Sequence, residues 1–140
     1  MLILGGIFMN KVKILLMAGI ISVGAIGSSV VYAASTSSYS TTVGRVNGDG
    51  YTGSLTKSIS NQAAKCYSKI GGGYGMDVRV QRTNGSQSGN WVRINSGHTV
   101  ELPNKIGANL STRLHFSNDI GTLVNVQVSG RWNPDKSNFK

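Results

Sequence analysis

The chain has 140 residues, enough for one domain and too few for two comfortable ones. Charged residues make up only 14% of the sequence and 19 residues are glycine, a balance that favours strands and turns over helices. The formal net charge of +9 attracts anionic partners in general but specifies none of them.

Residues 1–33 have the pattern of a signal peptide. Lys11 and Lys13 form a basic start, an apolar run covers residues 14–26, and small side chains precede a cut that we expect after Ala33. The run is shorter than the roughly 20 residues that span a bilayer, so we expect cleavage of a signal-peptide helix and no stable membrane anchor. The mature protein is then secreted, with 12 basic residues against five acidic ones and a net charge of +7.

The first eight residues do not fit a signal peptide, because they are apolar and uncharged. We therefore expect the true start at Met9. Residues 34–40 are polar and of low complexity, and they predict a flexible lead. Residues 41–140 then form a single β domain.

Alternation of apolar and polar residues with a period of two runs through this domain and predicts short amphipathic strands. It is clear in residues 76–81, 110–116 and 124–129, and it favours strand over a helical turn in residues 60–67. Tyr51, Leu55 and Ile59 share one face of a longer, weaker strand. The predicted core residues are Val78, Val80, Val92, Ile94, Val100, Leu102, Leu114, Phe116, Val124, Val126 and Val128.

Gly- and Asn-rich turns separate these strands, at residues 47–50, 71–75, 84–86, 95–97 and 118–121. Short amphipathic strands at this spacing predict an all-β fold, a small antiparallel β-sandwich or barrel.

The sequence carries no recognisable catalytic or metal-binding motif. The glycine run at 71–75 lacks the Lys-Ser/Thr and the helix of a phosphate loop, and Asp49 alone cannot make a calcium loop. His98, His115 and Cys66 are not at zinc-ligand spacing. Cys66 alternates in phase with apolar residues, so we expect a buried, inert thiol rather than a nucleophile. We expect no enzyme, no cofactor and no metal.

Several basic and aromatic residues share the outward phase of the predicted strands and define a candidate surface for an anionic or sugar-containing polymer. They are Lys65, Arg79, Trp91, Arg93, Arg113, His115 and Arg131. The alternative is that these positions are simply solvated, with arginine present for solubility.

The stretch Val-Ser-Gly-Arg-Trp-Asn-Pro-Asp, residues 128–135, closes the last predicted strand. In this motif and in its general plan the chain resembles small secreted β-proteins of unknown function from Gram-positive bacteria. That resemblance implies a β-sandwich and no assigned activity. In size, charge and export pattern the chain is also remotely similar to bacteriocins of the lactococcin 972 type.

The expected function is therefore that of a secreted or cell-envelope-associated, non-enzymatic protein that binds an anionic cell-wall polymer. Nucleic acid is a less suitable partner for an exported protein. The alternative is a bacteriocin-like antimicrobial protein, which size, charge and export support and which the lack of an amphipathic helix opposes.

Overall fold

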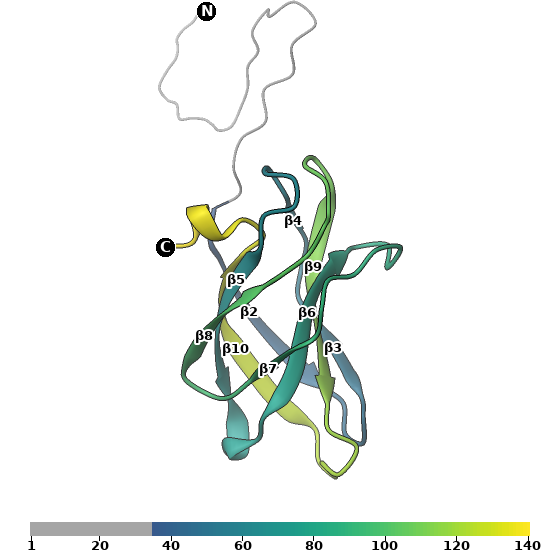
Figure 1. Ribbon diagram of the computed structural model, residues 1–140. Helices are drawn as coiled ribbons and strands as arrows, with labels where there is room; N and C mark the ends of the chain where they lie inside the picture. The colour runs from purple at the N-terminus through teal and green to yellow at the C-terminus, as the bar shows by residue number, and fades with distance from the viewer. Residues whose placement is uncertain (1–34) are drawn as a thin grey trace, which may run out of the picture. The chain divides into compact units, whose positions relative to one another are not determined.

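The computed structural model describes residues 35–140 (Figure 1). The predicted signal peptide and the start at Met9 lie outside the described residues. The strands are β2 (Ser37–Val43), β3 (Asp49–Tyr51), β4 (Leu55–Thr56), β5 (Ala64–Ile70), β6 (Met76–Arg82), β7 (Val92–Ile94), β8 (His98–Leu102), β9 (Ser111–Asn118) and β10 (Val126–Asn133). Two short 3₁₀ turns complete the described elements, η1 (Gly71–Gly73) and η2 (Lys136–Asn138).

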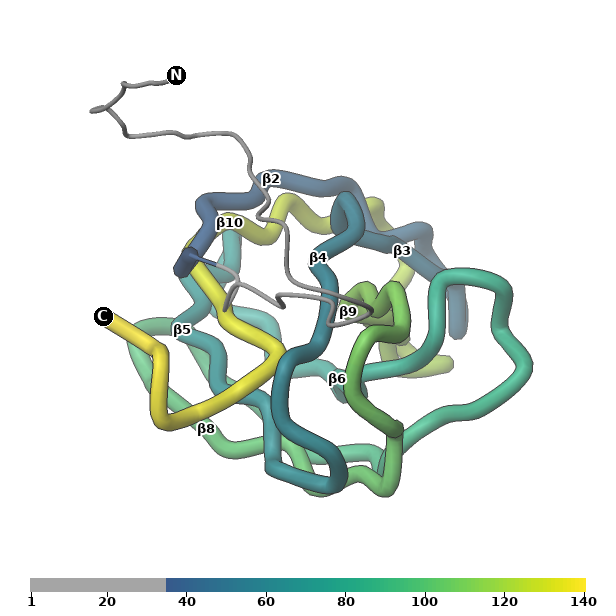
Figure 2. The backbone as a smooth tube through the Cα atoms, turned by 90° about the horizontal axis from the view of Figure 1, so that it is seen from above, coloured from purple at the N-terminus to yellow at the C-terminus, as the bar shows by residue number. Residues whose placement is uncertain are grey.

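The strands form two antiparallel sheets, which confirms the predicted all-β fold. The first sheet has the order β2-β10-β5-β8, and the second has the order β3-β9-β6-β7 with β4 also paired to β9. Figure 2 shows the strands of both sheets around a common interior. The connections β2–β3, β5–β6, β7–β8 and β9–β10 each pass from one sheet to the other at the same end of the domain. We call this the tip end.

The predicted core is correct except at one position. Most of the predicted residues are buried, while Val92 and Val100 are partly buried and pack against the core. The prediction that Val124 belongs to the core is wrong, because this residue is 47% exposed. Strand β10 begins only at Val126, so the alternation that includes Val124 extends into the preceding loop.

Two predicted boundaries also differ from the structure. Strand β2 begins at Ser37 and pairs with β10, so part of the predicted flexible lead is an edge strand of the first sheet. The predicted long strand carrying Tyr51 and Ile59 is divided into β3 and β4, and both side chains are exposed. Its apolar residues recur every fourth position, a spacing that does not by itself fix a continuous strand.

Cys66 is buried, as predicted. Its side chain lies in the core between the sheets, and burial raises the pKa of the thiol to about 12. The thiol is therefore protonated at neutral pH and a poor nucleophile.

A buried ion pair closes the end opposite the tip end, which we call the terminal end. Lys57 and Asp135 are both fully buried, with Nζ 3.1 Å from Oδ1. Lys57 Nζ also donates to the carbonyl groups of Gln62 and Pro134. The carboxylate accepts hydrogen bonds from the backbone N–H groups of Ser58 and Ile59, at 2.8 and 3.1 Å.

The charges of this pair are thus satisfied in the interior, as a buried pair requires. Burial alone would raise the pKa of Asp135, but the hydrogen bonds from Ser58 and Lys57 outweigh it and the pKa is lowered. The pair ties the segment after β4 to the segment after β10.

Candidate functional site

The outer face of the second sheet carries a row of aromatic and basic side chains, one from each neighbouring strand. Tyr51 in β3 pairs with His115 in β9, which pairs with Arg79 in β6. Because Val78 pairs with Val92, Trp91 follows in this row, immediately before β7. Antiparallel pairing places such residues side by side on one face.

His115 is at the centre of the row and is held on four sides. Its ring stacks on Tyr51 with centroids 4.6 Å apart and meets the edge of Trp91 at 4.9 Å. Arg79 Nε donates to His115 Nδ1 at 3.3 Å, so the ring proton lies on Nε2 and is donated to Asp49 at 2.7 Å. The side chain is nearly buried and serves to position its neighbours.

Two arginines cover the exposed rings of this row. The guanidinium of Arg79 lies 4.2 Å from the centre of the Trp91 ring, and that of Arg113 lies 3.9 Å from the centre of Tyr51. Arg113 Nε also donates to Gln81 Oε1 at 2.8 Å. Stacking and hydrogen bonding together fix both planar groups in place. We call Tyr51, Arg79, Trp91, Arg113 and His115 the arginine–aromatic surface.

Arg93 lies on the same sheet, but its charge is already paired with carboxylates of the protein. It forms two hydrogen bonds to the carboxylate of Asp119, at 2.6 and 2.7 Å, and lies 3.6 Å from Asp77. The hydrogen bonds from Arg93, together with its positive charge, lower the pKa of Asp119. Arg93 is therefore less available to an external anion than sequence patterning indicated.

The remaining predicted residues, Lys65 and Arg131, lie on the other sheet. Both approach the ring of Phe139, and Arg131 Nε donates to the carbonyl of Lys140. The predicted surface is thus divided between opposite faces of the sandwich. Period-two alternation shows which side chains point outward but not which sheet carries them.

Sequence reasoning missed Tyr51 as a member of this surface, and it missed Asp49 and Gln81 as the hydrogen-bond partners of His115 and Arg113. The sequence pattern places Tyr51 on one face with Leu55 and Ile59, whereas in the structure it flanks the buried Gly50 in the short strand β3 and is exposed. The available signal was the short alternation over residues 49–51, which ends before the next turn.

The balance of charge leaves Arg79 and Arg113 without carboxylate partners. All five acidic residues are engaged elsewhere: Asp49 with His115, Asp77 and Asp119 with Arg93, Glu101 with Lys136, and Asp135 with Lys57. The surface therefore presents two fixed positive charges and two exposed aromatic rings.

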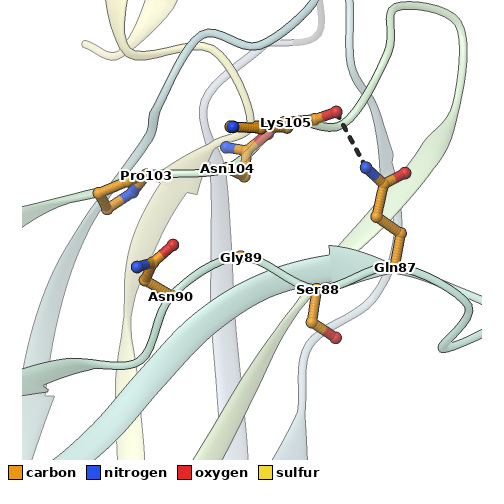
Figure 3. Close-up of a pocket in the computed structure, with 7 residues that line it drawn as sticks. All are labelled: Gln87, Ser88, Gly89, Asn90, Pro103, Asn104 and Lys105. Carbon is orange, nitrogen blue, oxygen red and sulfur yellow. Dashed lines mark hydrogen bonds between the residues drawn. The ribbon is translucent and has the colours of Figure 1, made fainter.

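A separate pocket of about 340 Å³ lies between residues 87–90 and residues 103–105 (Figure 3). Figure 3 shows the two segments facing each other, joined at one side by a hydrogen bond from Gln87 Nε2 to the carbonyl of Lys105. Asn90 N–H also donates to the carbonyl of Pro103. The lining includes Ser88 and Lys105 but no acid, histidine or cysteine. Ser88 has no histidine or carboxylate in this lining to activate its hydroxyl group as a nucleophile.

Within residues 35–140, no three His, Cys, Asp or Glu side chains gather as a metal site. The same part of the chain contains no helix that is long and apolar enough to cross a membrane. Comparison of the chain with family models, with curated proteins and with solved structures finds no significant match in any of the three.

Proposed function

We propose that this is a non-enzymatic protein of the cell exterior that binds an anionic cell-wall polymer on its arginine–aromatic surface. The observation that carries the proposal is the pair of fixed guanidinium groups of Arg79 and Arg113. Neither has a carboxylate partner, and each already uses its Nε within the protein. Their terminal nitrogens remain for a ligand.

Phosphate suits such groups, because a guanidinium can donate two parallel hydrogen bonds to one phosphate. The arginines of this surface are held by ring stacking before a ligand arrives, so less side-chain entropy is lost on binding. Repeated phosphates along one polymer chain would occupy both groups at once and raise the avidity.

The exposed rings of Tyr51 and Trp91 extend the surface beyond charge. Tyr51 and Trp91 are 40% and 43% exposed, so part of each residue is open to a ligand. The parts of these rings that Arg79, Arg113 and His115 leave exposed can also contact sugar units. A polymer of sugars or polyols joined by phosphate, such as a wall teichoic acid, fits both features.

The test is co-sedimentation of the protein with isolated Gram-positive cell walls. We expect Arg79→Gln with Arg113→Gln to weaken binding about tenfold, since each partly exposed charge contact contributes at most about 1 kcal/mol. Binding of the unmodified protein should also fall steeply from low to physiological salt.

Lys65→Gln with Arg131→Gln is the matched control, because it removes the same charge from the opposite sheet. We expect this control variant to bind walls almost as well as the unmodified protein does. Walls stripped of teichoic acid should bind neither of these two proteins. Equal losses in both double variants would show that net charge, rather than this surface, is responsible. Melting temperatures of all variants should agree.

A further inference from the structure

Four large apolar side chains gather at the tip end, away from the core. Val46 is in the β2–β3 loop, and Ile120, Leu123 and Val124 are in the β9–β10 loop. Their exposed fractions are 48%, 76%, 72% and 47%. We call these four residues the apolar tip. Figure 1 places both loops at the same end of the sandwich. Single exposed apolar residues are ordinary, but a group on adjoining loops marks a contact surface.

The two loops are bound to each other through their backbones. Val46 N–H donates to the carbonyl of Thr122 at 2.7 Å, and Asn47 N–H donates to the carbonyl of Asp119 at 3.2 Å. Arg45 N–H donates to the Asn125 side chain at 3.0 Å. These loop N–H groups are therefore satisfied inside the protein. This matters for a surface that enters an apolar phase, where an unpaired backbone group is costly.

The backbone at Val46 is strained in a way that favours another residue. Val46 has φ 53° and Asn47 has φ 59°, both in the left-handed region. Asparagine and glycine accept this conformation readily, whereas a β-branched residue adopts it at a cost. Val46 is exposed, so packing in the core does not explain its presence. Strain of this kind at an exposed position points to a role for the side chain outside the folded domain.

Both signs of charge occur at the tip end, but its three acids have partners and two of its cations have no carboxylate partner within residues 35–140. Arg45 is next to Val46, and Lys69 lies near the tip end of β5, and neither has a carboxylate partner among the described residues. Asp119 is held by both terminal nitrogens of Arg93, which also lies 3.6 Å from Asp77. Asp49 is bound to His115. An apolar patch next to the unpaired Arg45, with Lys69 at the same end of the domain, complements a surface that is apolar inside and anionic outside.

We propose that the apolar tip docks into the surface of a lipid bilayer that contains anionic lipids. Val46, Ile120 and Leu123 would enter the boundary between headgroups and acyl chains, while Arg45 and Lys69 contact lipid phosphates. Binding of this kind grows with the apolar area inserted and with attraction to anionic lipid. The proposal is independent of polymer binding, because the arginine–aromatic surface lies on the outer face of the second sheet.

The first test is sedimentation of the full chain with vesicles made of equal parts phosphatidylglycerol and phosphatidylcholine. We expect Ile120→Ser with Leu123→Ser to reduce the partition coefficient about tenfold or more, since two large apolar groups are lost. Ile59→Ser is the control, because Ile59 is also an exposed apolar residue but lies at the terminal end. Ile59→Ser should bind the anionic vesicles as the unmodified chain does. Vesicles of pure phosphatidylcholine should bind the unmodified chain and both variants more weakly.

The second test reports the tip directly, whatever the N-terminal segment contributes. Gly121 is exposed and a side chain there meets nothing within 4 Å, so Gly121→Cys can carry an environment-sensitive dye while Cys66 stays buried. We expect a blue shift when the anionic vesicles are added. The same dye at Ser86→Cys, an exposed position in the β6–β7 loop, should not shift.

Three results would overturn the proposal. One is vesicle binding by the Ile120/Leu123 double variant at the level of the unmodified chain, with no shift of the dye at position 121. A second is equal binding to anionic and neutral vesicles. The third is a dimer in sedimentation that the double variant abolishes, because the tip would then contact a second copy. Wall binding by the double variant should be unchanged, so failure here leaves the proposed function standing.

Discussion

The two ends of the sandwich are built on opposite principles. At the terminal end, charged groups are buried: Lys57 and Asp135 satisfy each other and several backbone groups in the interior. At the tip end, apolar groups are exposed and Val46 is strained. Each arrangement is the reverse of what burial alone favours. The fold therefore requires the side chains of the terminal end, whereas the tip end carries side chains that the fold does not need.

The largest expected effect is at the terminal end. Asp135→Ala leaves the Lys57 ammonium buried without its counter-charge and two backbone N–H groups without acceptors. Breaking a buried pair in this way costs about 3–5 kcal/mol, a large share of the stability of a domain this size. Urea unfolding followed by circular dichroism measures the loss. Glu101→Gln is the control, since it removes a half-exposed pair with Lys136 and should cost about 0.5 kcal/mol or less. Similar losses of unfolding free energy in both variants would show that the buried pair at the terminal end is no more important to the fold than an exposed pair.

The next largest expected effect is that of acid, which should lower the free energy of unfolding through Asp135. The pKa of Asp135 is lowered in the folded protein, so the unfolded chain binds the proton more tightly. The resulting stability is present above the ordinary carboxyl pKa of about 3.8 and is lost as pH falls through the lower, folded value. Urea midpoints measured from neutral pH downward should fall most steeply below about pH 4. In Asp135→Asn, which cannot ionise, this part of the pH dependence should disappear.

The smallest expected effect is at the tip end and has the opposite sign. Val46→Asn relieves a β-branched residue in the left-handed region and should raise the free energy of unfolding by about 1 kcal/mol. Thermal unfolding measures this gain. The same change should weaken binding to anionic vesicles, because it removes an apolar side chain from the tip. Val43→Asn serves as the comparison: Val43 is a fully buried valine in β2, so there the substitution should be strongly destabilising. If Val46→Asn also destabilises the protein, the tip end is part of the fold after all.

Much of the fold could be predicted because strand alternation depends on local sequence. Val78, Val80, Leu114 and Phe116 are buried as predicted, since β6 and β9 are central strands of the second sheet. Val124 could not be placed, because only the position of the loop after β9 decides where alternation stops.

The candidate surface was harder to predict, because it depends on which strands become neighbours. Arg79, Arg113 and His115 come together through the pairing of β6 with β9, as expected for outward residues. Arg131 has the same outward phase but belongs to the other sheet, and the pairing of Arg93 with Asp119 spans 26 positions. No local pattern contains that information.

The position of β10 affects the order in which the chain can fold. β10 lies between β2 and β5, so the first sheet is two separate pieces until this strand arrives. The second sheet draws its strands from residues 49–118, which are complete earlier during synthesis. Folding should therefore begin in the second sheet and end with the insertion of β10. This step pairs Val126 with Val43, two residues that are far apart in the sequence. The edges of β2 and β5 that face β10 therefore stay unpaired until this strand has been made.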